Sequence, residues 1–337
     1  MKGAKKPVRV HIFTFLCATG AMTSLLAFTS PPARPDRWQR LDTGTNALLV
    51  SIRFLDETTG FAVGGNKELD PAVLLRTADG GRKWSRYSTD VKARLYAIHF
   101  PTRYVGYVVG FAGTLLKTVD RGKSWRLVPT GVDSWLASVY FTSEDTGYIV
   151  GGGTEGKAVL LKTTDGGAAW RSLVQALPEN ARSESFRDIF FTNPSTGYVV
   201  GTGGVILKTT NGGAKWTSQS SGVKVWLRAI YFIDEKTGFV AGSGVLLKTE
   251  DGGRRWRRLD HPTGMKLNDV AFLDANRGYV VTFGGTILRT NDGGKTWKRV
   301  HTEPGRIPGH ITALHFPKPT VGYASAANGT VLKLEGP

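Results

Sequence analysis

The chain has 337 residues, a formal net charge of +17, 43 glycines and a single cysteine. One thiol excludes an internal disulfide framework and a cysteine-clustered metal site. The glycines are spread among 16 Phe, 10 Tyr and 9 Trp, which argues against collagen and disorder and favours short strands joined by tight turns. The basic excess favours an anionic partner, but charge alone does not choose among acidic proteins, lipid head groups, phosphorylated polysaccharides and nucleic acid.

Residues 1–30 have the layout of a targeting segment. A basic stretch, Met1–Arg9, precedes a mostly apolar one, Val10–Phe28, and prolines follow, which is the order of regions in a secretory signal. The cleavage site is poor, so a cleaved signal peptide and an uncleaved anchor that tethers the protein to the membrane both stay open. We expect export to the periplasm or a lumen. Because residues 1–30 hold four basic and no acidic residues, the remaining domain, residues 31–337, carries a charge of +13.

The rest of the chain repeats one unit. Six boxes share the pattern Leu-(Lys/Arg)-Thr-x-(Asp/Asn)-(Gly/Arg)-Gly-x-x-Trp, and their tryptophans are 40 to 46 residues apart. Between the boxes recur a short stretch that ends in Phe, such as Leu95–Phe100, and a Gly-aromatic stretch, such as Gly106–Gly110. Each unit therefore predicts four short strands, and a four-stranded unit of this length is typical of a propeller blade. The box tryptophans are Trp84, Trp125, Trp170, Trp216, Trp256 and Trp297.

The strand that ends in Phe occurs seven times, which predicts an all-β chain folded as a single seven-bladed β-propeller of four-stranded blades. The seventh blade lacks a fourth strand at the C-terminus, whereas Trp38–Leu41 resembles the fourth strand Trp125–Val128 and precedes the first blade. We therefore expect Trp38–Leu41 to pair with Val331–Leu334 and close the ring, which removes a free sheet edge. The seven phenylalanines are Phe54, Phe100, Phe141, Phe191, Phe232, Phe272 and Phe316.

We interpret the boxes as structural. An Asp or Asn side chain can accept backbone N–H groups within a tight turn, the glycines allow positive φ, and the Trp can pack between blades. In the second box Arg121 replaces the first glycine, which we expect to change that turn locally. One position of the third strand is always cationic and suggests a ring of positive charge, made of Arg76, Lys117, Lys162, Lys208, Lys248, Arg289 and Lys333.

The boxes are identified as Asp-boxes, and the longer unit resembles the photosystem II stability/assembly factor family, which includes relatives in non-photosynthetic bacteria. The likeness covers about residues 36–337 and rests on a Gly-Tyr-x-Val-Gly strand followed by the Leu-Lys-Thr-x-Asp-Gly-Gly-x-x-Trp box. It implies an exported, non-enzymatic assembly factor that docks on a membrane protein or membrane-protein complex through a basic, arginine-containing surface. We expect that partner to offer an acidic exposed segment, and we leave contact with the membrane surface open.

We further expect a monomer that uses no cofactor, holds no metal and binds no nucleic acid. The histidines show no close pair with metal-ligand spacing, and no glycine-rich phosphate loop precedes a helix.

Strand 1 of each blade lines the channel of a propeller, so its non-repeated residues mark a candidate site. Positions four and six before the Phe lie on one side of the strand because side chains alternate with a period of two. Arginine binds a carboxylate bidentately and Trp adds a flat apolar surface, which favours a partner-binding site at one channel mouth, opposite the boxes. The candidate residues are Arg187, Arg228, Trp226, Asn268, Lys266, Tyr96, Arg94 and Trp135, with Asp188 and Asp269 in place of a small residue three before the Phe.

Two alternatives stay open for this cluster. In the first, Arg187, Asp188 and their neighbours form inter-blade ion pairs that only fill the channel. In the second, Asp188 and Asp269 are the paired carboxylates of an Asp-box glycoside hydrolase, sialidase-like or β-glucan-acting. The Arg-Ile-Pro motif of sialidases precedes the boxes, whereas here Arg306–Pro308 follows all six. We predict that the protein is not an enzyme.

A second basic group lies in or next to the outer strand of the fifth blade. Edge strands commonly carry Lys and Arg, which prevents aggregation edge to edge, and we favour that interpretation for most outer basic residues. The densest group is the candidate secondary docking surface, and it consists of Arg254, Arg255, Arg257 and Arg258.

Overall fold

The computed structural model describes residues 36–67, 71–153, 157–300 and 309–335, which all belong to the compact unit Arg34–Pro337. The predicted targeting segment, residues 1–30, and the stretch Arg306–Pro308 lie outside the described residues. In the described part of the chain no helix is long and apolar enough to cross a membrane.

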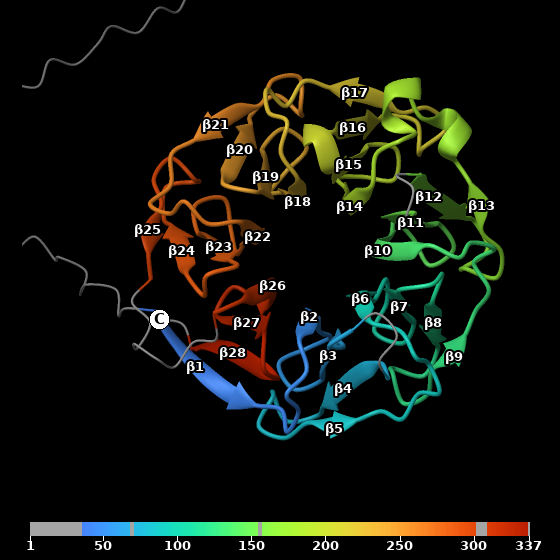
Figure 1. The fold of residues 1–337 in the computed structure, drawn as a ribbon. Coiled ribbons are helices and arrows are strands. Elements are labelled where there is room, and N and C mark those ends of the chain that lie inside the picture. The colour runs from blue at the N-terminus through green and yellow to red at the C-terminus, as the bar shows by residue number, and fades with distance from the viewer. Residues whose placement is uncertain (1–35, 68–70, 154–156, 301–308, 336–337) are drawn as a thin grey trace, which may run out of the picture. The chain divides into compact units, whose positions relative to one another are not determined.

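Seven antiparallel sheets of four strands stand in a ring, which confirms the predicted propeller (Figure 1), and their inner strands line a central channel. In each blade strand 1 faces the channel and strand 4 lies at the outer rim. Helical structure in the described ranges is limited to three short 3-10 helices, η1 (Val174–Ala176), η2 (Glu179–Ala181) and η3 (Thr202–Gly204).

The blades are numbered in chain order from the first inner strand. Blades 1 to 3 are formed by β2 (Leu49–Phe54), β3 (Gly60–Gly64), β4 (Val73–Thr77) and β5 (Ser85–Arg86); β6 (Leu95–His99), β7 (Gly106–Gly110), β8 (Leu115–Thr118) and β9 (Arg126–Leu127); and β10 (Trp135–Phe141), β11 (Gly147–Gly152), β12 (Ala158–Thr163) and β13 (Arg171–Ser172). Blades 4 and 5 are formed by β14 (Phe186–Phe191), β15 (Gly197–Gly201), β16 (Ile206–Thr209) and β17 (Thr217–Gln219), and by β18 (Leu227–Phe232), β19 (Gly238–Gly242), β20 (Val245–Thr249) and β21 (Arg257–Leu259). Blades 6 and 7 are formed by β22 (Leu267–Phe272), β23 (Gly278–Thr282), β24 (Ile287–Thr290) and β25 (Lys298–Arg299), and by β26 (Ile311–Lys318), β27 (Val321–Ala326), β28 (Thr330–Glu335) and β1 (Arg37–Asp42).

The first described strand closes the ring. β1 pairs with β28 in antiparallel register, with Trp38 opposite Leu334 and Leu41 opposite Val331, which confirms the predicted pairing. In Figure 1 the blue β1 lies beside the red β28. Blade 7 therefore draws its four strands from both ends of the described chain.

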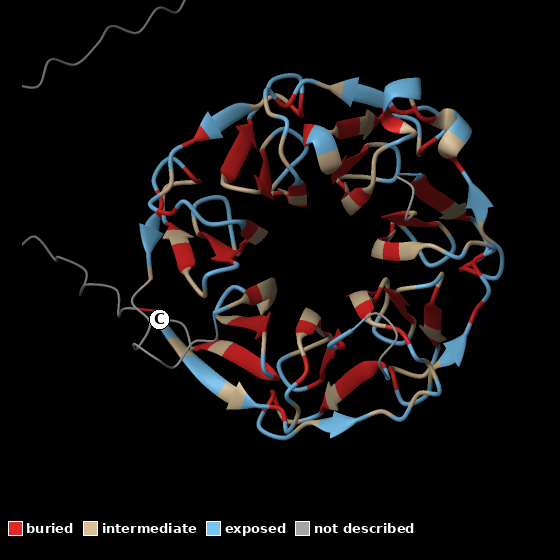
Figure 2. Cartoon of the chain, viewed as in Figure 1, coloured by how far each residue is buried: buried red, intermediate tan, exposed pale blue. Residues whose placement is uncertain are grey.

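Aromatic side chains hold neighbouring blades together. Between blades 2 and 3, Tyr107 stacks on Phe141 with ring centroids 4.0 Å apart, and Trp170 of the third box meets Phe141 edge-on at 6.0 Å. On the closing strand Trp38 takes an equivalent place, edge-on to Tyr279 at 5.7 Å. Strands 2 and 3 are accordingly buried and the short outer strands are exposed, as Figure 2 shows.

The Asp-boxes are turns that the Asp side chain closes, as predicted. In the third box Asp165 Oδ1 accepts the N–H groups of Ala168 and Ala169 at 2.9 and 3.0 Å. The two glycines after it, Gly166 and Gly167, have φ angles of 66° and 78°, which glycine adopts without steric cost.

The second box keeps this turn although Arg121 replaces its first glycine, so the expectation of a local change is wrong. Arg121 has a φ of 67°, and its N–H donates to the Tyr104 carbonyl at 2.9 Å, as the equivalent Gly166 does to Asp145. A left-handed conformation costs a residue with a side chain about 1–2 kcal/mol. The Arg121 guanidinium binds the Asp56 carboxylate, and this ion pair offsets part of that cost.

A second repeated contact ties three of the boxes to the preceding blade. Tyr107 of strand 2 and Lys117 of strand 3 both donate to the Gly166 carbonyl of the next box, each at 2.6 Å. The same two bonds end at Gly212 and Gly252 in the following blades. At these interfaces the predicted ring of cations is therefore engaged in blade-to-blade contacts.

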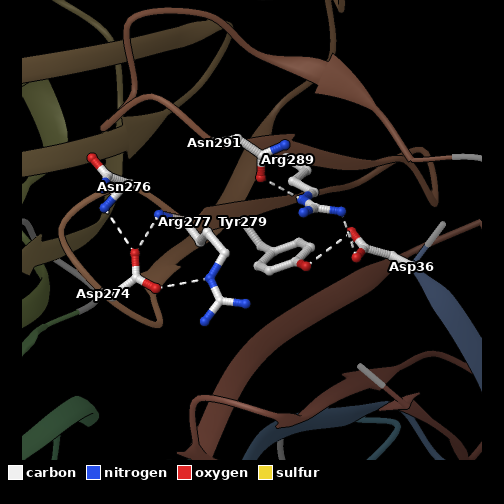
Figure 3. Close-up of polar contacts among 7 residues, drawn as sticks. All are labelled: Asp36, Asp274, Asn276, Arg277, Tyr279, Arg289 and Asn291. Carbon is white, nitrogen blue, oxygen red and sulfur yellow. Dashed lines mark hydrogen bonds and ion pairs between the residues drawn. The ribbon is translucent and has the colours of Figure 1, made fainter. Parts of the chain in front are cut away.

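Blade 7 has no box, and Asp36 supplies the missing acceptor. Tyr279 donates to Asp36 Oδ2 at 2.9 Å, and Arg289 binds Asp36 Oδ1 at 2.6 Å (Figure 3). The side chain of Asp36 is 2% exposed and that of Arg289 is 18% exposed. A carboxylate two residues before Trp38 thus replaces the glycine carbonyl of the boxes and fixes the closing strand by its charge.

We expect Asp36→Asn to lower the free energy of unfolding by about 3 kcal/mol, because removing one partner of a buried ion pair leaves the other charge uncompensated. Urea denaturation followed by tryptophan fluorescence measures the change. Asp42→Asn on the same strand is the matched control, since the Asp42 carboxylate accepts the exposed N–H of Gly44. Equal stability of the two variants would contradict this role of Asp36.

Candidate functional site

A β-bulge in every inner strand shapes the channel wall. In β14, Phe186 pairs with Gly201 and Asp188 pairs with Val200, so Arg187 is the extra residue. The same shift occurs in the other six inner strands. A bulge sets two residues against one and re-aims their side chains, so Arg187 and Asp188 both line the channel. The predicted strict alternation is therefore wrong at this position.

The channel has a volume of about 660 Å³ and is lined by all seven inner strands. Strand 1 runs toward the face that carries the boxes, because the loop after strand 1 contacts the box of its own blade. The positions four and six before the Phe therefore surround the opposite opening, which we call the channel mouth. The residues directly before the Phe surround the other end, which we call the channel floor.

At the channel mouth, Arg187 lies between two tryptophans of the neighbouring blades. Its guanidinium carbon is 4.5 Å from the ring centroid of Trp135 and 4.9 Å from that of Trp226. Tyr96 meets Trp135 edge-on at 5.8 Å. Cation–π contacts on both sides hold the guanidinium in place. The structure thus brings together four predicted residues from blades 2, 3, 4 and 5.

Arg187 and Arg228 carry their charges without a counterion among the described residues. Burial, together with the charge of Arg228, lowers the pKa of Arg187 to about 10, and burial also lowers the pKa of Arg228. The Nε atoms of both are buried without a hydrogen-bond partner, and neither guanidinium forms an ion pair with any described residue. Buried charges are costly unless paired, so this arrangement attracts an anion.

Asp188 and Asp269 link neighbouring blades. Asp188 accepts the Ser138 hydroxyl and the Ile230 N–H, both at 2.9 Å, and Asp269 accepts the Leu314 N–H at 2.7 Å. Burial raises the pKa of Asp188 to about 6 and that of Asp269 to about 7. Both oxygens of each carboxylate accept protein donors. The arginine–aspartate ion pairs that the sequence left open are not formed among the described residues.

We expect the stability of the wild type relative to Asp269→Asn to fall as pH rises from about 4 to about 7. The folded pKa of Asp269, about 7, lies above its ordinary value of 3.8. Its contribution is therefore fully present below the ordinary value and is lost as pH rises through the folded value. Urea denaturation of both proteins across this range should show a relative loss of roughly 1–3 kcal/mol. A pH-independent difference would contradict the raised pKa of Asp269.

Two other predicted residues at the mouth are engaged with the main chain. Arg94 donates to the Gly65 carbonyl at 3.1 Å and also to the Asn66 carbonyl. Asn268 Nδ2 donates to the Ile311 carbonyl at 2.7 Å, whereas its Oδ1 is buried without a partner. Arg94 therefore joins blades 1 and 2, and Asn268 retains one free acceptor.

An exposed apolar ridge borders the mouth on blades 5 and 6. Trp226, Met265 and Phe283 are 45%, 42% and 50% exposed and make up half of the exposed large apolar side chains in the described ranges. Lys266 Nζ lies 5.8 Å from the Phe283 ring, and that ring lies 4.3 Å from His310 of the channel wall. Met265 and Phe283 were not predicted, because neither occupies a compared position of strand 1.

The channel floor was not predicted either. A comparison of the position directly before the Phe would have found it, because Arg and His break the repeat there. Within the described residues no group of three or more His, Cys, Asp or Glu side chains could hold a metal ion. The floor residues are Arg53, His99, Tyr140, Phe190, Tyr231, Ala271 and His315.

The outer basic patch is exposed, but most of its side chains have partners in their own blade. Arg255 and Arg257 lie 3.4 and 3.8 Å from carboxylates, and Arg258 donates to a main-chain carbonyl at 3.2 Å. Arg254 is also exposed. This patch therefore offers less uncompensated charge than its composition suggests.

Solved structures share the fold of this chain. A structure described as "YCF48 bound to D1 peptide" matches with a TM-score of 0.73 and 20% identity over 89% of this chain and 97% of that one. YCF48 from Cyanidioschyzon merolae matches with a TM-score of 0.69 and 21% identity, over 88% and 98%. The GH74 xyloglucanase from Xanthomonas campestris matches with a TM-score of 0.70 and 13% identity, over 88% and 53%. The class of protein is thus an Asp-box β-propeller, here with a cationic channel mouth.

The sequence narrows this class to one family. The family described as Photosynthesis system II assembly factor YCF48 matches residues 31–131, 174–263 and 259–335, which is well over half of the chain. The chain belongs to this family, which confirms the predicted resemblance. A comparison with individually curated proteins found no match.

Proposed function

We propose that the protein is an exported, non-enzymatic assembly factor that docks at its channel mouth on an acidic exposed segment of a membrane protein. The unpaired pair Arg187 and Arg228 is the observation that carries this proposal. A carboxylate would satisfy these buried cations bidentately, which a water molecule cannot do. Membership of the YCF48 family and the YCF48 structure that holds a D1 peptide support a polypeptide partner.

The apolar ridge supports a partner segment that carries a large apolar side chain next to its acidic residue. Trp226 belongs to the ridge and also contacts Arg187, so an anion site and an apolar surface adjoin. Interfaces commonly place aromatic and arginine side chains at their centre.

Export is supported by the order of basic and apolar residues in 1–30.

Glycoside hydrolysis gains no comparable support, because both oxygens of Asp188 and of Asp269 already accept protein donors. A monomeric state and contact with the membrane surface remain predictions.

Isothermal titration of the full chain with a synthetic acidic peptide tests the proposal. The peptide carries two acidic residues beside one Phe, and its twin has Asn and Gln in place of the acids. We expect the acidic peptide to bind at least about tenfold more tightly, since a bidentate arginine–carboxylate contact contributes more than a neutral amide. Equal affinity of the twins, or no binding of either, would contradict docking on an acidic segment.

A further inference from the structure

The channel floor holds a third cation that the proposed docking site does not use. Arg53 of blade 1 lines the channel, and burial lowers its pKa. Its guanidinium makes no ion pair with any described residue. A cation in this position is unfavourable unless an anion accompanies it.

Two histidines flank Arg53 on the adjoining blades, and the backbone fixes which ring nitrogen carries hydrogen. The Phe141 N–H donates to His99 Nε2 at 3.3 Å, and the Phe54 N–H donates to His315 Nδ1 at 3.2 Å. A ring nitrogen that accepts a hydrogen bond is unprotonated, so the other nitrogen of a neutral ring is a donor. Burial, together with Arg53, lowers the pKa of His99 to about 3 and that of His315 well below its usual range, so both rings are neutral.

The free donors are therefore His99 Nδ1–H and His315 Nε2–H. Both rings line the channel. The hydrogen bonds of these rings to described residues use the other nitrogen, and neither His99 Nδ1 nor His315 Nε2 is among the fully buried atoms that lack a partner, so both donors are accessible from the channel space. With Arg53 they form a row of three donors on the consecutive blades 7, 1 and 2.

The opposite side of the floor is aromatic and carries no carboxylate in the described chain. Tyr140 and Tyr231 donate their hydroxyl groups to main-chain carbonyls of the next blades, each at 3.0 Å. The buried Asp188 and Asp269 lie two residues earlier in their strands and are held by backbone donors. The rings on this side follow one another at centroid distances of 5.1, 5.6 and 5.5 Å, in the order His99, Tyr140, Phe190 and Tyr231.

We propose that Arg53, His99 and His315 form a binding site for a small oxyanion of carboxylate size at the channel floor. The guanidinium supplies charge and paired donors, and the two imidazoles supply neutral donors whose orientation the backbone holds. The site is separate from the pair Arg187 and Arg228 at the mouth. Its ligand is either a free solute anion or a carboxylate of the partner that reaches through the channel.

Thermal unfolding of the full chain in sodium formate, at ionic strength kept constant with sodium chloride, tests the site. A ligand that binds the folded state raises the melting temperature with concentration. The test is made in the background of Arg187→Ala and Arg228→Ala, because the mouth cations would also bind formate. In that background Arg53→Met should abolish the rise, and in formate-free buffer it should melt at or above the temperature of the background variant, because it replaces a half-buried charge without an ion-pair partner in the described chain by an apolar side chain of similar length. Arg103→Met, at a side chain that is 56% exposed, is the matched control and should respond like the wild type.

Imidazole 15N spectra of the wild type give a readout that does not depend on a variant. Formate should shift the ring signals of His99 and His315, and the same shift should persist in the variant with Arg187→Ala and Arg228→Ala, whether or not the mouth binds an acidic segment. If formate alone shifts them, the ligand is a free anion, and if only the acidic peptide shifts them, the ligand is the partner's carboxylate. Unmoved histidine signals with both probes, or a formate-induced rise in melting temperature that survives Arg53→Met in the background of Arg187→Ala and Arg228→Ala, would overturn the proposal.

Discussion

Deletion of residues 36–42 from the full chain should abolish cooperative folding of the propeller. The deletion removes β1 with its six residue pairs to β28, the Trp38 ring and the Asp36 carboxylate. Truncating a packed Trp costs about 3–5 kcal/mol and breaking a buried ion pair costs about as much, which together match much of the roughly 5–15 kcal/mol that stabilises a domain. The exposed edge of β28 would also invite strand pairing between molecules.

Circular dichroism during heating and size-exclusion chromatography would record this loss. Deletion of the seven residues 29–35 is the length-matched control, because it leaves β1 and Asp36 in place. Cooperative melting of the 36–42 deletion at the wild-type temperature would show that the ring does not depend on its closing strand.

The second large effect concerns binding. The double variant with Arg187→Ala and Arg228→Ala should weaken the affinity for the acidic peptide by at least about 100-fold, because truncating one partner of a desolvated charge pair costs about 2–5 kcal/mol and each 1.4 kcal/mol is tenfold. Most of the loss should fall on the dissociation rate. Surface plasmon resonance resolves the two rates.

The same variant should remain folded, which separates a binding defect from a folding defect. Neither guanidinium has an ion-pair partner among the described residues, so their removal leaves no acid uncompensated. Asp188 keeps its own donors, Ser138 and Ile230. A melting temperature well below that of the wild type would assign the arginines a structural role instead.

The architecture was predictable because it is repeated. All seven blades offer the same Phe and Gly-aromatic residues and six of them offer the box, so the copies reinforce one interpretation. The resemblance of Trp38–Leu41 to the fourth strands of other blades predicted the pairing with Val331–Leu334. Cationic and aromatic residues at the mouth were also visible, since they depart from the repeat.

What remained hidden depends on geometry that no single strand encodes. The bulge at Arg187 turns two successive residues into the channel, and its position leaves no signal in the alternation of side chains. Asp36 has its role because blade 7 has no box that could supply an acceptor. Only the closed ring brings Asp36 beside Tyr279 of blade 6. The sequence alone also could not show whether Arg187 forms an ion pair with Asp188. In the structure the Asp188 carboxylate instead accepts a hydrogen bond from the neighbouring blade 5.

Titration calorimetry of the acidic peptide at about 0.05 M and about 0.3 M salt, with two variants side by side, tests the central claim most directly. One variant carries Arg187→Ala and Arg228→Ala, and the other reverses the exposed charges of Arg254, Arg255 and Arg258 to Glu. Salt screens exposed charges more than buried ones. We therefore predict that the mouth variant loses most affinity at both salt concentrations and that the outer variant loses little at the higher one. Wild-type affinity of the folded mouth variant would contradict the claim and leave Arg187 and Arg228 as residues that fill the channel.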